Sequence, residues 1–310
     1  MRVLVSGGAG FIGSHTVDAL VARGVHQVSV IDNLAAGKRE QVNAGARRYE
    51  VDVRDADAVR KAIERERPEV LVHLAAQMDV RRSVADPAFD AQVNLVGFLN
   101  LMEAGRANGL RRVVFSSTGG AIYGEQERFP CDEEHPLRPV SPYGVAKLAT
   151  EKYLFFYRAQ YGIDYVALRY ANVYGPRQDP HGEAGVVAIF CGRMLEGRPA
   201  TIYGDGGQTR DYVFVDDVVR ANLAALESAA AGAFNIGTGV ETSVKQLHET
   251  LARIAGVSRA PEFGPARPGE QRRSVILPER AARELGWRPE VELSSGLART
   301  FEFFRKRAAR

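Results

Sequence analysis

The sequence is poor in the residues that build metal centres and disulfide frameworks. Its only cysteines are Cys131 and Cys191, which have no C-x-x-C spacing and no accompanying Cys/His cluster. We therefore expect no metal site and a reducing, cytoplasmic compartment. No stretch approaches the ~18 apolar residues of a membrane span. The apolar start at residues 3–5 runs into glycines instead of a signal-peptide core, so we expect no membrane partner.

The chain also lacks a strong excess of charge of either sign. Its 41 basic and 38 acidic residues give a net charge of +3 and are spread along the sequence. This distribution offers no basic stripe for nucleic acid, which we exclude as a partner. The one basic cluster, the C-terminal RKRAAR, is typical of a solvated helix end. Lysine is scarce, since only six of the basic residues are lysines.

The length and composition predict an ordinary globular protein. With 310 residues, 45% of them hydrophobic and 25% charged, the chain can bury a sizeable core in two lobes. We expect a dinucleotide-binding domain over residues 1–174. Shorter elements and Gly-rich or Pro-rich loops follow, and they predict a smaller substrate-binding lobe over residues 175–310. We expect the chain to cross between the lobes more than once.

A glycine cluster, VSGGAGFIGSH, begins at Val5 and contains two overlapping motifs that end at Gly13. A β-branched run precedes it, a helical pattern follows it, and the next apolar strand ends at Asp32, 19 residues past Gly13. This order is typical of a βαβ unit that binds a dinucleotide. The glycines allow a tight turn and close approach of the backbone to the pyrophosphate at a helix N-terminus.

The acid at the second strand end indicates the type of dinucleotide. Asp32 is suited to bind the adenosine ribose, and Asn33 follows it with no Arg to receive a 2′-phosphate, so NAD is favoured over NADP. Lys38 and Arg39 are close enough in sequence to leave NADP open.

Strands and helices continue to alternate to about residue 170, which predicts an α/β fold with a doubly wound parallel sheet (Rossmann). One long helix is expected through residues 87–105. Polar and small residues at or past the strand ends include Asp52, Ala75, Ala76, Thr118 and Asn172, where ligands bind in such sheets. His73 lies inside an apolar strand, where we expect a core histidine.

Tyr143 and Lys147 stand four residues apart at the start of a predicted helix, so they project from the same face. A phenol with a pKa of ~10 is a poor base at neutral pH, and lowering that pKa by about three units takes roughly 4 kcal/mol. The positive charges of a nearby ammonium and of a cationic nicotinamide ring could provide this stabilisation of the phenolate. Lys147 could also donate to ribose hydroxyls.

Several further stretches carry a family resemblance over essentially the whole chain. They are GGAGFIGSH, DNL, HLAAQ, FSSTGGAIYG, SPYGVAK, LRYANVYGPRQ, TRDYVFVDDVV, NIGTG and RPGE. With these motifs the sequence resembles the extended short-chain dehydrogenase/reductase family, and within it the UDP-glucose 4-epimerases.

The resemblance implies a set of site residues. The NAD-binding set would be Gly7, Gly10, Phe11, Ile12, Gly13, Asp32, Asn33, Asp52, Val53, Leu74, Ala75 and Ala76, together with Tyr143 and Lys147. Tyr143 would be the base, Thr118 its hydroxyl partner and Lys147 the activator. Because the segment 115–123 is one residue longer than in the best-known epimerases, Ser117 competes with Thr118 for the hydroxyl role. Residues Asn172, Arg210, Arg267 and Glu270 would hold the nucleotide diphosphate of a UDP-sugar.

The implied reaction is epimerisation at C4 of a UDP-hexose through a transient 4-keto sugar. A 4,6-dehydratase would carry Asp-Glu after Thr118, and a sugar-acid decarboxylase a Glu near Ala121, but here Gly119, Gly120 and Ala121 follow. A nucleotide-sugar reductase of the same family and a regulator that binds NAD without turnover are the remaining alternatives.

Two further expectations concern assembly and substrate range. The helix with the catalytic pair continues with aromatic residues at 153–157, more than one core-facing stripe needs. The resemblance implies that this helix and the preceding one form a four-helix contact in a homodimer. Ser274 falls where the resembling epimerases line the pocket beside the sugar 2-position, and a small side chain there implies that N-acetylated hexoses are accepted.

Overall fold

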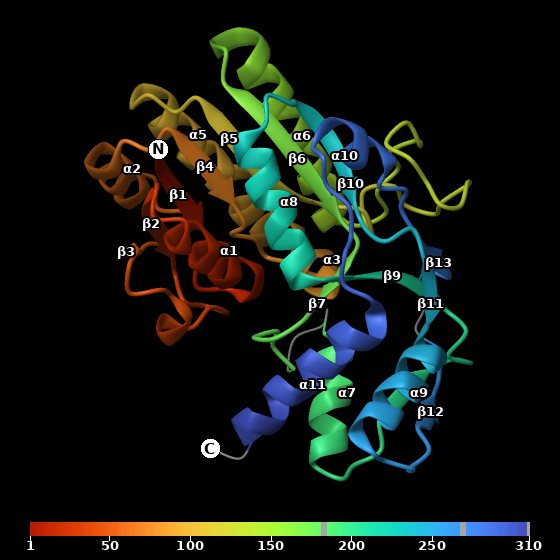
Figure 1. The fold of residues 1–310 in the computed structure, drawn as a ribbon. Helices are drawn as coiled ribbons and strands as arrows, with labels where there is room; N and C mark the ends of the chain where they lie inside the picture. The colour runs from red at the N-terminus through yellow and green to blue at the C-terminus, as the bar shows by residue number, and fades with distance from the viewer. Residues whose placement is uncertain (181–184, 267–270, 309–310) are drawn as a thin grey trace.

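A seven-stranded parallel sheet forms the larger part of the molecule in this computed structural model, which describes residues 1–180, 185–266 and 271–308 (Figure 1). The strand order is β10-β6-β5-β4-β1-β2-β3, with every neighbouring pair parallel. The strands are β1 (Arg2–Ser6), β2 (Gln27–Asp32), β3 (Arg47–Glu50), β4 (Val70–His73), β5 (Arg112–Thr118), β6 (Asp164–Tyr170) and β10 (Gly232–Ile236). The predicted doubly wound parallel sheet is confirmed.

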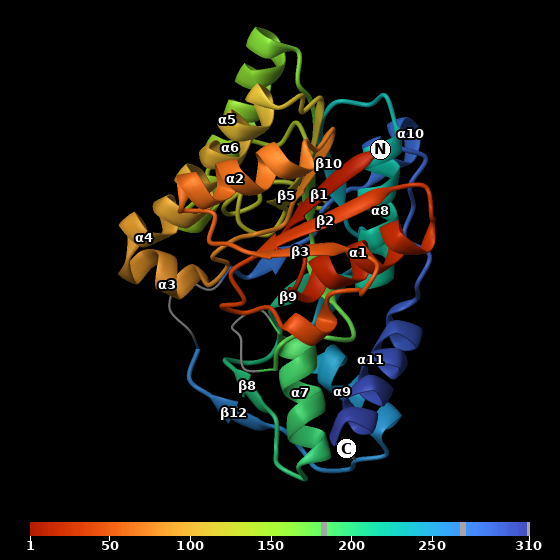
Figure 2. The same ribbon diagram turned by 90° about the vertical axis from the view of Figure 1, so that its left-hand side faces the viewer.

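Helices cover both faces of this sheet (Figure 2). One face carries α1 (Phe11–Ala22) and α8 (Val215–Glu227), and the other carries α2 (Ala56–Glu66), α5 (Gly97–Ala107) and α6 (Pro142–Tyr161). The strands are therefore buried on both sides, which explains why they are continuous apolar runs.

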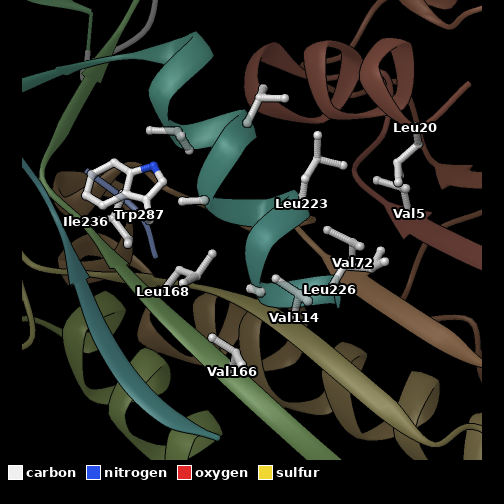
Figure 3. Packing of buried hydrophobic residues seen from close by; sticks show 14 of the residues in the cluster. Val5, Leu20, Val72, Val114, Val166, Leu168, Leu223, Leu226, Ile236 and Trp287 are labelled. Atoms are coloured by element: carbon white, nitrogen blue, oxygen red, sulfur yellow. The ribbon is translucent and has the colours of Figure 1, made fainter. Parts of the chain in front are cut away.

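The core beneath α8 joins segments that are far apart in the sequence. Leu226 of α8 lies beside Val72 and Val114 of the sheet, whereas Leu223 points toward α1 (Figure 3). The indole of Trp287 packs in the same cluster, and its N–H donates to the Asp217 carbonyl oxygen at 2.8 Å. This apolar layer fixes the strand ends at which the functional residues lie.

The helix expected through residues 87–105 is interrupted. The structure has α4 (Pro87–Ala91), a π-helical turn η2 (Gln92–Val96) and then α5, after the short helix α3 (Val80–Ala85). The Asn94 amide in the π turn exchanges hydrogen bonds with the Gln77 backbone, donating to its carbonyl and accepting from its N–H, both at 2.9 Å. Single π turns inside α-helices are frequent at functional sites.

A smaller group of strands and helices lies beyond the carboxyl edge of the large sheet (Figure 1). Its four-stranded sheet consists of β7 (Asn172–Tyr174), β9 (Thr209–Phe214), β11 (Glu241–Ser243) and β13 (Arg273–Ser274), and β8 (Thr201–Tyr203) pairs with β12 (Glu262–Gly264). Helices α7 (Val186–Leu195), α9 (Val244–Ala255) and α11 (Leu293–Ala308) enclose its core.

The chain passes between these two parts repeatedly. It leaves the large sheet after β6, returns through α8 and β10, and leaves again into β11 and α9. The short helices η1 (Arg39–Gln41) and α10 (Glu279–Glu284) complete the described elements. Within the described ranges, no helix combines the length and apolar character that a bilayer crossing requires.

Candidate active site

The glycine loop between β1 and α1 leaves no room for side chains. Gly7 has a φ of +76°, and a Cβ there would lie 2.6 Å from the Ala75 backbone nitrogen. A Cβ on Gly13 would overlap the carbonyl oxygen of Gly7. Gly10 is the N-cap of α1 and has no side-chain cap for the helix amides. The loop therefore fits a dinucleotide pyrophosphate, which needs bare backbone and free amides at a helix N-terminus.

Asp32 ends β2 beside this loop and is 8% exposed. Its carboxylate accepts hydrogen bonds from the backbone amides of Ala9 at 2.9 Å and Leu34 at 2.8 Å. These bonds fix the carboxylate at the edge of the loop and leave it further lone pairs for a ribose hydroxyl.

Asn33 directly follows Asp32, and Asp52 lies just past β3 at the same edge of the sheet. Asn33 donates to Asp52 at 3.0 Å, and the Arg54 guanidinium donates to both Asp52 oxygens at 3.0 and 2.8 Å. The hydrogen bonds from Arg54 hold the pKa of the Asp52 carboxyl well below its usual range. A pocket of about 420 Å³ opens beside this group and is lined by Asp52, Arg54, Asp55, Gln92 and Val96.

The other predicted NAD-binding residues lie around the same loop. Phe11 and Ile12 open α1, and the Leu74 amide, just past β4, donates to the Ser6 carbonyl at 2.9 Å. Val53 is buried, with its side chain against Gly97. The structure thus gathers all the described residues of this set at one edge of the sheet.

Tyr143, Lys147 and Thr118 meet where α6 passes the end of β5. The Tyr143 hydroxyl is hydrogen-bonded to the Thr118 side chain. Lys147 is 3% exposed, its Nζ donates to the Ser116 carbonyl oxygen at 2.7 Å, and it lies 5.7 Å from the centre of the Tyr143 ring. The sequence spacing on α6 therefore does place phenol and ammonium on one face.

Ser117, the competitor of Thr118, has a different partner. Its hydroxyl donates to Glu151 at 2.6 Å, and Glu151 forms a buried ion pair with Arg169 of β6 at 2.7 Å. Successive residues at the end of β5 are thus contacted by Lys147, Glu151 and Tyr143, which stand one turn apart on α6. Sequence reasoning missed Glu151, although it continues the four-residue spacing of the pair.

The pKa values of the pair move in opposite directions. Burial lowers the pKa of Lys147 to about 8. Burial raises the pKa of Tyr143, and the Asp90 carboxylate raises it further, while the hydrogen bond to Thr118 opposes both effects. The sequence predicted that Lys147 would lower the pKa of Tyr143, but within the chain alone the cost of desolvating a phenolate is the larger effect.

Asp90 belongs to a buried polar group that the sequence did not reveal. One of its oxygens accepts hydrogen bonds from Gln77 at 3.0 Å and Asn94 at 2.9 Å, and the residue is 1% exposed. No sequence spacing relates Gln77 to Asp90, because the loop after β4 brings the two together.

The predicted nucleotide-binding residues lie on the smaller sheet. Asn172 begins β7, and Arg210 of β9 pairs in register with Ser274 of β13. The Arg210 guanidinium donates to the Thr209 carbonyl at 2.7 Å, and Ser274 is 4% exposed. Arg267 and Glu270 lie outside the described residues.

The smaller sheet reaches the catalytic segment directly. Ile276, two residues past Ser274, packs on Gly119, where a Cβ would come within 2.7 Å of the isoleucine Cδ1. Gly119 follows Thr118, so the chain just past β13 packs directly beside the end of β5. A further groove of about 530 Å³ between α7, α9 and α11 contains none of the predicted site residues.

Comparisons with known proteins agree with the fold and the candidate active site described above. The sequence model of the NAD dependent epimerase/dehydratase family matches residues 3–237. A UDP-glucose 4-epimerase of Mycolicibacterium smegmatis is 50% identical over 99% of this chain and 100% of its own length.

Two solved structures are similarly close. The UDP-glucose 4-epimerase of Thermotoga maritima, solved with UDP-glucose, is 51% identical with a TM-score of 0.97, covering 99% of this chain and 100% of its own. The UDP-glucose 4-epimerase of Thermus thermophilus, solved with NAD, is 50% identical with a TM-score of 0.93, covering 98% of this chain and 99% of its own. The predicted resemblance is confirmed: the chain belongs to the NAD dependent epimerase/dehydratase family.

Proposed function

We propose that the protein catalyses the NAD-dependent interconversion of UDP-glucose and UDP-galactose through a transient 4-keto sugar. The observation that carries this proposal is the meeting of Tyr143, Thr118 and Lys147 at the edge of a glycine loop built for a dinucleotide. The close full-length similarity to UDP-glucose 4-epimerases supports it.

Different residues of the chain bind the cofactor and carry out the proton transfer. The glycine loop and α1 would hold the pyrophosphate of NAD, and Asp32 the adenosine ribose. When bound, NAD supplies an acceptor and a donor for the C4 hydride. Tyr143 removes the proton of the sugar 4-hydroxyl and later returns it, and Thr118 orients both hydroxyls by hydrogen bonding.

Lys147 acts on the tyrosine and on the cofactor. Its buried ammonium stabilises the Tyr143 phenolate, which a phenol with a raised pKa cannot sustain unaided. A bound oxidised cofactor would supply a second positive charge that favours the phenolate. The preference for NAD over NADP has additional support, because Arg39 is paired with Glu50.

The segment after Thr118 argues against the related reactions. Dehydration would need carboxylates near positions 119 and 120, but Gly119 is enclosed by Ile276 and by the Tyr170 carbonyl oxygen, 3.2 Å from a Cβ placed there. A carboxylate side chain does not fit at that position without rearrangement. A regulator without turnover would have no need of the contacts among Tyr143, Thr118 and Lys147.

The two parts of the chain have separate tasks in this proposal. Residues 1–174 hold NAD, and residues 175–310 hold the nucleotide sugar, with α8 and β10 returning to the large sheet. Asn172, Arg210, Arg267 and Glu270 would together hold the nucleotide diphosphate part of the substrate, as the family resemblance implies. The small side chain of Ser274 leaves room for an N-acetylated sugar.

We also propose a cytoplasmic homodimer. Both cysteines are free and buried, as suits a reducing compartment. On the outer face of α6, Phe155 is 63% exposed, and Phe156 and Tyr161 are exposed beside it. Such a contiguous apolar face is typical of a protein interface.

The proposal is tested by incubating purified protein with UDP-galactose and no added cofactor, and identifying the product sugar. We expect UDP-glucose, and NAD released from the protein by denaturation, because a cycle that returns its hydride has no need to release the cofactor. UDP-N-acetylgalactosamine, with natural protein and Ser274→Tyr, tests the substrate range. A cofactor-free preparation that acts only with added NADPH would contradict the proposal.

A further inference from the structure

Lys147 is a buried ammonium whose nearest hydrogen-bonding partner is neutral. Its Nζ donates to the Ser116 carbonyl oxygen and lies 4.8 Å from the centre of the Phe115 ring. Neither contact carries the full negative charge that a buried ammonium ordinarily needs. The charge that keeps Lys147 protonated must therefore come from the elements packed around it.

Two of the surrounding titratable groups provide none or only the smaller part of that charge. His73 of β4 is buried and neutral, since burial and the nearby ammonium lower its pKa to about 3. Glu151 lies one turn along α6, but Arg169 of β6 binds both of its carboxylate oxygens, at 3.0 and 2.7 Å. Because Arg169 compensates Glu151 locally, Glu151 raises the pKa of Lys147 less than the Asp90 carboxylate does.

The elements α3, α4, η2 and α5 also pack on α6. On α5, Glu103 accepts a hydrogen bond from Tyr157 and is paired with Arg106 at 2.7 Å. The turn η2 has no charged residue, and the charged residues of α3, Arg81 and Arg82, are exposed. Asp90, the one buried charged residue on α4, is left as the buried anion that no cation neutralises within the described part of the chain. Its partners Gln77 and Asn94 are neutral amides.

A short chain of hydrogen bonds connects Asp90 to the helix of Lys147. Asn94, which donates to Asp90, accepts a hydrogen bond at its carbonyl oxygen from Thr150 at 3.4 Å. Thr150 follows Lys147 by one helical turn. The second carboxylate oxygen of Asp90 is buried and receives no hydrogen bond from any residue that the structure describes. No hydrogen bond from the described residues therefore compensates the charge on this oxygen.

We propose that Asp90 is a positioning residue whose uncompensated charge keeps the Lys147 ammonium protonated at working pH. This inference deepens the proposed function, because it assigns Lys147 its role in stabilising the Tyr143 phenolate. The same carboxylate opposes ionisation of Tyr143. The Asp90 carboxylate thus stabilises the protonated form of Lys147. Lys147 and, when bound, the cofactor stabilise the ionised form of Tyr143.

The test titrates Lys147 directly by NMR in protein labelled with ¹³C at lysine Cε, from pH 6.5 to 10.5. Six lysines give few signals, and Lys147→Met identifies the relevant one. Asp90→Asn keeps an oxygen to accept from Gln77 and Asn94 and removes only the charge. We expect its Lys147 midpoint to fall about one pH unit below that of the natural protein.

Three variants control the result. Asp90→Glu retains the charge while disturbing the packing, so its midpoint should stay near the natural value. Glu66→Gln neutralises a buried carboxylate on α2, which is paired with Arg47, and should not move the midpoint. Asp90→Ser provides a second neutral variant should Asp90→Asn not fold.

In Asp90→Asn, the pH at which kcat for UDP-galactose declines on the alkaline side should fall by the same amount. Natural protein that shows the Lys147 shift but converts no UDP-galactose would overturn the proposed function and leave the Asp90 inference standing. A Lys147 midpoint within 0.2 pH units of the natural value in both neutral variants would overturn the Asp90 inference, whatever the activity.

Discussion

At the scale of single residues, the proposed chemistry depends on the Tyr143 hydroxyl. Its hydrogen bond to Thr118 and the nearby Lys147 ammonium place it in the role of the base. The phenol ring is itself part of the packing at the start of α6. Removing the oxygen alone therefore separates chemistry from structure.

We expect Tyr143→Phe to lower kcat by about 10² to 10⁴, because a general base is lost while the ring remains. Binding of the UDP-sugar, measured by calorimetry, should stay within a few-fold of the natural value. Thr118→Val is the companion variant, since it removes the hydroxyl partner at nearly constant volume. Near-full activity of Tyr143→Phe would assign the base role elsewhere.

His73 gives a residue-scale prediction about stability. It is buried between Phe98 and Phe115, its Nδ1 is hydrogen-bonded to Ser6 at 2.7 Å, and burial lowers its pKa to about 3 from 6.5. The unfolded chain therefore binds a proton below pH 6.5 that the folded protein excludes until about pH 3. Stability from this group is complete above pH 6.5 and declines as the pH falls.

Between pH 7 and pH 5 this group should reduce the free energy of unfolding by about 2 kcal/mol. In His73→Asn that share of the pH dependence should disappear, although the variant is less stable throughout. Urea unfolding at several pH values measures the slope. An unchanged slope in His73→Asn would show that His73 is not the responsible group.

At the scale of elements, the glycine loop and α1 form the unit that receives the dinucleotide. Gly13→Ala should abolish the retention of NAD, because the added methyl group overlaps the Gly7 carbonyl oxygen and displaces α1 from the loop. NAD content after gel filtration measures this. Gly192→Ala on α7 is the control, since a Cβ there meets nothing within 4 Å. Full NAD retention in Gly13→Ala would contradict the assigned role of the loop.

The order of elements was predictable because it follows from local patterns. Asp32 follows an apolar strand at a diagnostic distance from Gly13, and Tyr143 and Lys147 are one helical turn apart. The π turn and the Asp90 group were not predictable, since both depend on the Asn94 contact with Gln77 from another segment. The four-residue spacing of Glu151 from Lys147 was visible in the sequence. Its role was not, because it depends on the ion pair with Arg169 on a different strand.

At the scale of the whole molecule, α6 presents its aromatic face to the exterior. We expect light scattering to give twice the 33.9 kDa of one chain, with this face forming the contact. Phe155→Glu should produce a monomer, because a charge would be buried in the interface. Val25→Glu, at a position 69% exposed in the loop between α1 and β2, should remain dimeric. A stable monomer of the natural protein in dilute solution would refute the dimer.

The central claim is that hydrogen leaves C4 of the sugar and returns to C4 within one active site. UDP-galactose carrying deuterium at C4 tests it most directly, with the product analysed by NMR and mass spectrometry and no cofactor added. We predict UDP-glucose with the deuterium still at C4. Deuterium at C6 would indicate a dehydratase, and its loss to water would indicate deprotonation at carbon, so either result would contradict the proposed mechanism.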